Sequence, residues 1–403
     1  MAATEWREFT LAGESCGGII PGELSAQARL YPDGIWFQAW NNNLRTAYGL
    51  DHFGAKWKEP RLRGMSERIR NLFLAAPEES GLSPVVYSPS MKAWIGSIKY
   101  HGGGEDLYCT ADLSISLIWA LRMHQDLKPD DEMVARAIRY GEALCRFQLP
   151  SGAIPSYIQR ETFSIHPRLR QTAQSAASAW FLLELYRVCG QAQFLEAAQK
   201  VAEFIRREVI PGHRYFDFET YYSCSKKPEG FFDPHTGLHA HNNLSLYWTV
   251  QTFRCLAEIT GKKEFEDLLF YTADLLCLYQ QVWDPPYLSV DGFGGFGVMN
   301  TDGEWNDMRQ VMFAELLADL AQQSGSVEYR SPARAALQAA AALFCGPENP
   351  SYIGHRVEIC GRMPENFGHI GINTPCGRST FHWCEGNLLT ALAYIDRHHP
   401  ISG

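Results

Sequence analysis

The sequence feature that most constrains the fold is a helical pattern that repeats with a glycine at its turn. Three segments with helical spacing of apolar residues end in Gly190, Gly261 and Gly325, and an aromatic residue follows each glycine by four positions. Glycine readily adopts the left-handed conformation that ends a helix, and the aromatic side chain anchors the first turn of a returning helix on its predecessor. The pattern therefore predicts helical hairpins in Leu182–Ile205, Cys255–Tyr279 and Leu316–Phe344.

Other segments extend the same plan. The three glycines lie 71 and 64 residues apart, an interval that holds two helices and a long loop. Further helices are predicted at Asn42–Phe53, Leu62–Leu74, Asp112–Asp126, Asp131–Gln148 and His382–His398, with only short extended pieces such as Tyr215–Tyr221 and Gly294–Met299. The predicted helices number eleven, one short of six hairpins, so we expect the last helix to pair with the N-terminal region.

We predict an all-α fold, an (α/α)6 toroid whose six hairpins form inner and outer rings with long loops at one mouth. Residues 1–403 are treated as a single catalytic domain with an irregular N-terminal segment at 1–38. An open α-solenoid is the alternative, because hairpin repeats alone do not require closure. The long, chemically distinctive loops favour the closed ring, since such loops usually carry function.

Unusual residues gather in the loops that lead into the predicted inner helices. Six such loops combine Trp, His, Asn, Arg and carboxylates, and in a closed ring they would meet at one mouth. Asn43, Asp112, Asn243 and Asp307 also suit helix N-caps, so each alone has an ordinary structural explanation. Helix starts that face one mouth point backbone N–H groups into it, which favours anionic or polyhydroxyl ligands.

The hairpin period, the chain length and the decorated loops resemble the six-hairpin glycosidase superfamily of (α/α)6 toroids. The resemblance covers most of the chain and is architectural, without a single diagnostic motif. It implies a carbohydrate substrate and, as the default reaction, attack of water with inversion. Members include uronic-acid-releasing glycosidases, and related toroids are polysaccharide lyases and sugar epimerases, so the resemblance leaves the reaction open.

Glycoside hydrolysis needs two carboxyl groups across the scissile bond. Glu304 and Asp307 are three residues apart at a predicted helix start and share a face, with Trp305 beside them as a platform for a sugar ring. They are the preferred catalytic pair, with a solvated capping arrangement as the alternative. The reserve candidates are Asp112, Glu219 and Glu385, and alternation along an extended piece would place Asp217 on the same side as Glu219.

A second set of residues is predicted to bind the substrate by ring stacking, hydroxyl contacts and carboxylate recognition. Arg binds a carboxylate in a bidentate manner, so a uronic acid suits a site with several arginines, although salt bridges to neighbouring acids are equally consistent. The predicted binding residues are Trp40, Asn43, Arg45, Tyr48, His239, His241, Asn243, Trp305, Arg309, His369, Arg378 and His382.

These residues predict an exo-acting glycoside hydrolase that releases a terminal glucuronate from an oligosaccharide. A uronate lyase or a sugar epimerase that uses His and Tyr on the same fold is the first alternative. A non-enzymatic helical-repeat binding protein is the second. We expect no cofactor and no metal, because Cys360, Cys376, Cys384 and His382 match no zinc spacing and no phosphate-binding glycine motif is present.

Composition narrows the remaining possibilities. The net charge of −9 without a Lys/Arg run argues against nucleic acid as a partner, and no apolar stretch is long enough for a membrane span. The 11 cysteines contain no CxxC pair and are expected to be reduced. Residues 1–10 lack the pattern of a signal peptide, so we expect a cytoplasmic location, or a periplasmic or secreted one if a leader was removed. The expected partner is an acidic oligosaccharide, and a homo-oligomer stays open.

Overall fold

The computed structural model describes residues 5–20, 33–39, 41–97, 106–222, 226–283, 292–301, 307, 311–344, 364–365, 379–380 and 382–400. Its helices are α1 (Asn43–Lys56), α2 (Pro60–Leu74), α3 (Thr110–Asp126), α4 (Asp131–Phe147), α5 (Ser175–Cys189), α6 (Ala192–Phe204), α7 (Phe218–Tyr222), α8 (Asn243–Thr260), α9 (Lys263–Cys277), α10 (Met312–Ser324), α11 (Val327–Ala342) and α12 (His382–His398). The all-α prediction is confirmed, and the turn of each predicted hairpin lies where it was expected, whereas α5 and α8 begin well before the predicted starts Leu182 and Cys255.

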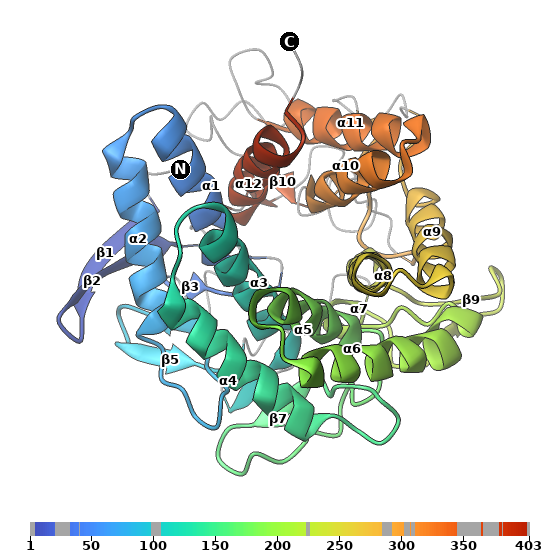
Figure 1. Ribbon diagram of the computed structural model, residues 1–403, viewed down its shortest axis with the longest axis horizontal. Coiled ribbons are helices and arrows are strands. Elements are labelled where there is room, and N and C mark those ends of the chain that lie inside the picture. Colours follow the sequence, from blue (N-terminus) through green and yellow to red (C-terminus); the bar gives the residue numbers. More distant parts are fainter. Residues whose placement is uncertain are drawn as a thin grey trace.

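The helices form two concentric layers of a ring (Figure 1). Helices α1, α3, α5, α8, α10 and α12 line the inside, and α2, α4, α6, α9 and α11 pack around them. Around the inner layer, α1 contacts α3, α3 contacts α5, α5 contacts α8, and α10 contacts α12. The rings of Tyr247 and Phe313, with centroids 5.0 Å apart, join α8 to α10. Because α12 also packs against α1, the ring is closed, as the toroid prediction requires.

The glycine turns behave as the repeat predicts. Gly190, Gly261 and Gly325 adopt φ angles of 70°, 64° and 67° and end α5, α8 and α10 in the left-handed conformation. The aromatic residues that follow differ in their partners. Phe265 stacks on Phe253 of its own hairpin, whereas Tyr329 stacks on Phe270 of α9, the outer helix of the preceding hairpin. The repeated aromatic residue therefore fixes neighbouring hairpins together as well as closing one turn.

Helices α1 and α12 meet in a close seam where the chain's two ends join. A Cβ atom on Gly386 would lie 2.2 Å from Thr46 Oγ1, and one on Gly49 would lie 3.2 Å from the backbone of Leu389. The Thr390 hydroxyl donates to the carbonyl oxygen of Arg45 at 2.6 Å. In the part of the chain that the structure describes, no outer helix follows α12, so this seam completes the inner ring without a sixth outer partner.

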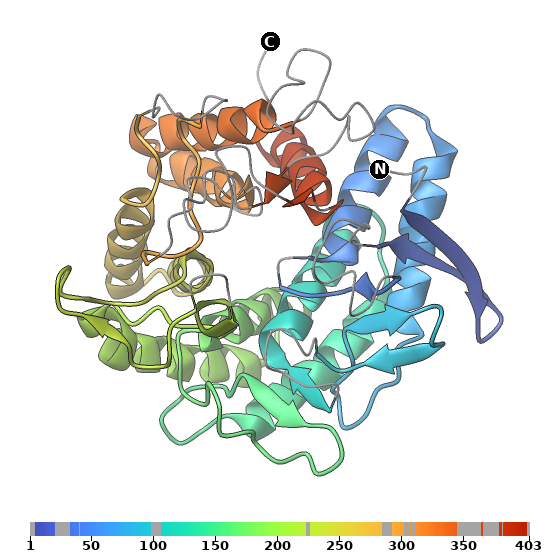
Figure 2. The same cartoon turned by 180° about the vertical axis from the view of Figure 1, so that it is seen from behind.

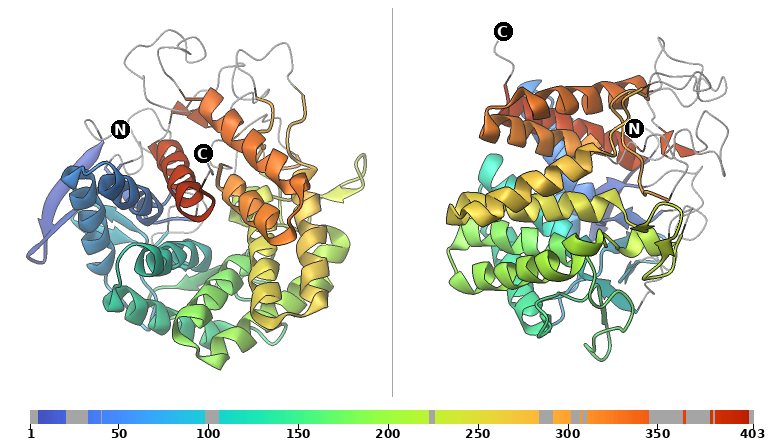
Figure 3. Two further views of the ribbon diagram at one scale, coloured as in Figure 1. Left: turned by 45° about the horizontal axis from the view of Figure 1, so that its top comes forward. Right: turned by 90° about the vertical axis from the view of Figure 1, so that its right-hand side faces the viewer.

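Short strands lie in the segments that connect the helices and in the N-terminal segment. They are β1 (Trp6–Leu11), β2 (Glu14–Ile19), β3 (Ile35–Trp36), β4 (Val86–Ser88), β5 (Ala93–Ile95), β6 (Leu107–Cys109), β7 (Tyr157–Gln159), β8 (Phe232–Asp233), β9 (Leu238–His239), β10 (Pro364–Glu365) and β11 (Ser379–Thr380). Apart from the three-stranded order β3-β4-β5, they pair two by two as antiparallel hairpins or bridges: β1-β2, β6-β7, β8-β9 and β10-β11. Strands and long loops gather on one face of the ring, the face toward which the inner helices begin (Figures 2 and 3).

The structure differs from the sequence-based expectations in two short segments. The N-terminal segment, expected to be irregular, contains the β1-β2 hairpin, and β2 packs against α2. The piece Tyr215–Tyr221 was expected to be extended, but Phe218–Tyr222 forms α7 because Asp217 accepts hydrogen bonds from the backbone N–H groups of Glu219 and Thr220. Aspartate in this position caps a helix start, and that local bond outweighs the alternation of the side chains.

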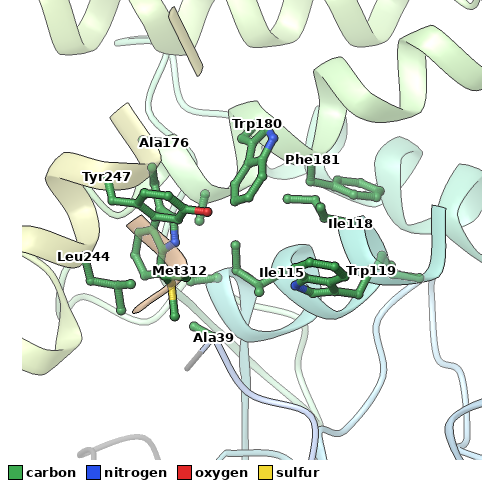
Figure 4. Packing of buried hydrophobic residues seen from close by; sticks show 14 of the residues in the cluster. Ala39, Ile115, Ile118, Trp119, Ala176, Trp180, Phe181, Leu244, Tyr247 and Met312 are labelled. Carbon is green, nitrogen blue, oxygen red and sulfur yellow. The ribbon is translucent and has the colours of Figure 1, made fainter. Parts of the chain in front are cut away.

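The inside of the ring is filled by large apolar side chains. Figure 4 shows Ile115, Ile118 and Trp119 of α3 facing Trp180 and Phe181 of α5, with Tyr247 of α8 nearby. Trp119, Trp180 and Tyr247 are each at most 1% exposed, so the ring interior is a packed core. The cysteines whose state the structure describes are free thiols, as expected: Cys16, Cys109, Cys145, Cys189, Cys255 and Cys277. Among the described helices, none is both long and apolar enough to cross a membrane.

Candidate functional site

Hydrogen bonds connect the loops that lead into neighbouring inner helices. The backbone N–H of Ala39, ahead of α1, donates to Asp112 Oδ1 in the first turn of α3 at 2.9 Å. Asn42, the N-cap of α1, donates from Nδ2 to Ser116 Oγ on α3 at 2.8 Å. The starts of α1 and α3 are thereby held together at the mouth, and Asp112 is one of the residues that hold them.

Asp112 is a buried carboxylate with an unusual proton affinity. Its side chain is almost fully enclosed, and this burial raises its pKa from 3.8 to about 7. The hydrogen bonds from Ala39 and from the Cys109 thiol lower the pKa, and the negative charge of Glu219 raises it. Burial disfavours the charged form of a carboxyl group, and a second carboxylate nearby acts in the same direction. Asp112 therefore keeps its proton up to near-neutral pH.

A glutamine that the sequence reasoning did not single out links Asp112 to Glu219. Gln174, at the start of α5, donates from Nε2 to Cys109 Sγ at 3.7 Å, and its Oε1 accepts from the backbone N–H of Phe218 at 3.0 Å. Cys109 in turn contacts Asp112, and Phe218 begins the helix that carries Glu219. One side chain thus fixes the relative positions of both carboxylate-bearing segments. A polar residue ahead of a long apolar helix is the only sequence signal for it.

Asp217 anchors α7 in the mouth. Its Oδ1 accepts from the backbone N–H groups of Glu219 and Thr220 at 2.9 and 3.2 Å, and its Oδ2 accepts from the N–H of Ser245 on α8 at 3.2 Å. Burial raises the pKa of Asp217 to about 7, although these bonds lower it. The residue holds α7 against α8, and Glu219 is buried in the same helix.

His241 and Asn243 lead into α8 beside the segment 297–301. The backbone N–H of His241 donates to Asn300 Oδ1 at 2.9 Å, and Asn243 Nδ2 donates to the carbonyl oxygen of Gly297 at 2.9 Å. His241 is 1% exposed, and burial lowers its pKa to about 4, although the Asn243 side chain beside it acts in the opposite direction. His241 is therefore neutral at neutral pH, and its burial opposes protonation.

Below the mouth, a buried network of ion pairs occupies the inner helices. Arg45 pairs with Glu315 of α10, and its guanidinium lies 4.6 Å from the ring centre of Trp119. Arg122 covers the same tryptophan at 4.7 Å and approaches Glu315 at 3.6 Å. Farther along the helices, Glu184 accepts from Trp180 Nε1 at 3.0 Å, and its pKa is lowered despite burial, above all by the positive charges of Arg187 and Arg122. These charges are paired with one another, so that removing one partner would leave a buried charge less well compensated.

Known proteins are similar to this chain in structure but not in sequence. No family model matches the chain, and no curated protein matches its sequence. The cellobiose 2-epimerase of Spirochaeta thermophila superimposes with a TM-score of 0.61 at 9% identity, over 95% of this chain and 90% of that one. The unsaturated glucuronyl hydrolase of Bacillus sp. GL1, described as responsible for glycosaminoglycan degradation, gives 0.54 at 12% identity over 94% of both chains. A polysaccharide lyase gives 0.53 at 16% identity, over 92% and 94%.

The chain has the six-hairpin glycosidase fold. The expected resemblance is thus confirmed at the level of architecture, over most of the chain. The proteins that share it include an epimerase, a hydrolase and a lyase, so the fold leaves the reaction open.

The remaining predicted residues fall into three groups. Asp307 and Glu385 are buried near the starts of α10 and α12, and the backbone N–H of Asp307 donates to the carbonyl oxygen of Phe296 at 2.8 Å. His382 is the first residue of α12. The residues Trp40, Glu304, Trp305, Arg309, His369 and Arg378 lie outside the described residues.

Several predicted binding residues are already engaged with protein groups. The Asn43 amide bonds the backbone of Ile19 and Trp36 and so holds β2 against α1. Arg45 has Glu315 as its carboxylate partner, and Tyr48 donates to Asp126 Oδ2 at 2.9 Å. His239 bonds through Nδ1 to the carbonyl oxygen of Phe231 at 3.0 Å.

Two cavities lie outside the centre of the mouth. The larger, about 1070 Å³, is at the opposite end of the ring between the last turns of α1 and α3, where Arg63 and Arg70 pair with acidic residues. The smaller, about 470 Å³, is beside the mouth and includes His239 in its wall. In the described part of the chain, no three His, Cys, Asp or Glu side chains form a group that could hold a metal ion.

Proposed function

We propose that the protein is a glycoside hydrolase in which Asp112 and Glu219 act as the carboxyl pair. The observation that carries the proposal is their proximity: they belong to different segments of the mouth, both are buried, and the charge of Glu219 raises the pKa of Asp112. Glycosidic cleavage requires two carboxyl groups near the scissile bond, one to give a proton and one to act as a base, and the raised pKa of Asp112 suits the first role. Both were reserve candidates, while Glu304 of the preferred pair lies outside the described residues.

In this mechanism, Asp112 is the general acid and Glu219 the general base. Asp112 gives its proton to the glycosidic oxygen as the bond to the anomeric carbon breaks. Glu219 takes a proton from the water whose oxygen attacks that carbon from the opposite face, so the configuration inverts. Gln174 and Asp217 position the two groups through Cys109 and α7. Asp307 and Glu385 remain candidates for contacts with the same substrate.

The proposed substrate is an oligosaccharide that ends in glucuronate. Similarity to the unsaturated glucuronyl hydrolase supports this class, as do the helix starts that face the mouth. Because Arg45 is paired with Glu315, carboxylate recognition in this proposal depends on Arg309 and Arg378.

The test is incubation with glucuronate- and galacturonate-terminated oligosaccharides, with two readouts: new reducing ends and the ultraviolet absorbance of an unsaturated uronide. We expect reducing ends without absorbance, and a loss of at least about a hundredfold in kcat for Asp112→Asn and for Glu219→Gln. Asp126→Asn, at the far end of the same helix α3, is the matched control and should retain activity. Full activity in both mouth variants would refute the assignment.

A second function, epimerisation, is favoured by one observation. The His241 ring contacts the rings of Tyr215 and Tyr279, with centroids 5.9 and 4.6 Å apart, so an imidazole and two phenol groups, the groups that an epimerase would use for proton transfer, lie together at the mouth. The cellobiose 2-epimerase shares the fold. In heavy water, incorporation of deuterium into an unhydrolysed sugar by the wild type, and its loss in His241→Gln, would select this function instead.

A further inference from the structure

The smaller cavity, beside the mouth, has the size and lining of a ligand site. Its volume of about 470 Å³ lies within the range of roughly 300–1,000 Å³ usual for small-molecule sites. It lies between the end of α6 and the two segments that precede α7 and α8. The side chains that matter for the argument are Phe204, Phe216, Phe231, Arg214, Glu229 and His239.

Three phenylalanines give the cavity an aromatic lining. Phe204 and Phe216 are buried, and Phe231 is partly exposed. Flat aromatic faces pack well against the C–H faces of a sugar ring, and they give specificity for shape without charge.

The polar groups of the cavity offer both donors and acceptors. Arg214 forms no ion pair within the described residues, so its guanidinium donors are available to a ligand. His239 uses Nδ1 for the carbonyl oxygen of Phe231, which leaves Nε2 for the cavity. The Glu229 carboxyl is bonded to the backbone of Leu169, and burial raises its pKa. With Glu208, which pairs with Arg207, the lining holds one cation, two carboxyl groups and one imidazole, a set that suits hydroxyl groups better than a strongly charged anion.

The backbone around the cavity is irregular where it forms the wall. Helix α6 runs into a π-helical turn at Ile205–Val209 and then a 3-10 turn at Ile210–Gly212, and His213 has a φ of 49°. Single π-turns are rare and occur frequently at functional sites. Here the π-turn brings Glu208 and Val209 into the cavity wall.

The cavity shares its walls with the mouth. Phe216 directly precedes Asp217, which anchors the helix of Glu219, and Ala240 directly precedes His241. Thr172 lies two residues before Gln174. We propose that this cavity is an accessory subsite that binds a neutral, hydroxylated sugar ring of the same oligosaccharide. This inference rests on the proposed function, because it takes the bound sugar ring to be part of the oligosaccharide that the enzyme cleaves.

The first experiment measures binding without catalysis, with cellobiose as a neutral disaccharide probe. The NMR signal of the His239 ring should shift on addition of cellobiose, and the shift should disappear in Arg214→Ala and in Phe231→Ala. Arg206→Ala is the matched control, because Arg206 lies on the π-turn and pairs with Glu203 of α6, and neither residue lines the cavity. No shift at the solubility limit, or a shift that neither cavity variant alters, would overturn the subsite.

The second experiment connects the subsite to turnover. Arg214→Ala and Phe231→Ala should lower kcat/KM about tenfold for a glucuronate-terminated tetrasaccharide and leave the corresponding disaccharide unchanged. Equal loss on both lengths, or none on either, contradicts a role for the cavity in substrate binding. If Asp112→Asn and Glu219→Gln keep full activity while cellobiose still shifts the His239 signal, the proposed catalytic pair fails and the sugar site stands.

Discussion

Replacing Asp112 with asparagine should make the protein more stable at alkaline pH while removing its activity. In the folded chain, burial raises the pKa of Asp112 from 3.8 to about 7. The folded state therefore holds a proton that the unfolded state releases once the pH exceeds about 4. Stability must fall as the pH rises from about 4 to about 7, and the loss is complete above that range.

The magnitude follows from the size of the shift. Each unit of pKa difference corresponds to about 1.4 kcal/mol, so the buried carboxylate costs about 4 kcal/mol at pH 8. Part of this cost is already present at pH 5, because the unfolded group is ionised there. Between pH 5 and pH 8 the wild type should lose roughly 2.6 kcal/mol through this residue. The asparagine side chain of the variant does not titrate, and its oxygen can still accept the N–H of Ala39.

The measurement is urea unfolding of wild type and Asp112→Asn at pH 5 and pH 8. The stability of the variant relative to the wild type should rise by about 2–3 kcal/mol between the two pH values. Asp126→Asn is the control with the opposite electrostatics, because the bond from His398 helps to lower the pKa of Asp126 and its removal should destabilise the chain at both pH values. An Asp112→Asn difference that is the same at pH 5 and pH 8 would refute the reasoning.

Three further predictions test other parts of the ring. Glu184→Gln should cost about 1.5–3 kcal/mol in urea unfolding, because it removes one carboxylate from Arg187 and Arg254, both of which keep Glu258; a cost under about 1 kcal/mol contradicts a structural ion network. Gly49→Ala should lower Tm, since its Cβ would lie 3.2 Å from the backbone of α12, whereas Gly64→Ala, which meets only the Arg68 side chain, should not. For His241→Gln, the stability relative to wild type should improve by about 2 kcal/mol from pH 7 to pH 5, because the folded imidazole, with its pKa lowered to about 4, resists protonation that the unfolded one accepts; a pH-independent difference argues against a buried neutral imidazole.

Much of the fold was predictable because its signals are local. A glycine that ends a helix is visible in the sequence, and Gly190, Gly261 and Gly325 adopt the predicted conformation. The expected pairing of the last helix with the N-terminal region is also confirmed, since α12 packs against α1 and closes the ring. The reserve carboxylates Asp112 and Glu219 could be named from the sequence for a similar reason, because each lies in a polar segment near a loop that enters a predicted helix.

The contacts between those residues were not predictable, because they join distant parts of the chain. Arg45 was expected to meet a substrate carboxylate, yet it pairs with Glu315, which lies 270 residues farther along. The only hint was an acidic residue within an apolar helix. Gln174 was missed because its role depends on Cys109 and Phe218, two segments that meet only in the closed ring. Asp217 was placed on a strand because alternation gives no weight to a capping bond.

The strongest physical reason to place the chemistry at the mouth is that carboxyl groups there behave differently from those in the ring interior. Burial raises the pKa values of Asp112 and Asp217 to about 7, although backbone N–H groups that donate to them act in the opposite direction. Glu184 and Asp319 are also largely enclosed, but guanidinium groups face them and their pKa values are lowered. Glu315, one turn into α10, is paired with Arg45, and burial still raises its pKa. It therefore combines the ion pairing of the interior carboxylates with the raised pKa of those at the mouth. Glu184 and Asp319, deeper in the interior, stay charged and pair with arginines of the inner helices. Asp112 and Asp217 at the mouth can exchange a proton near neutral pH, as acid–base catalysis requires.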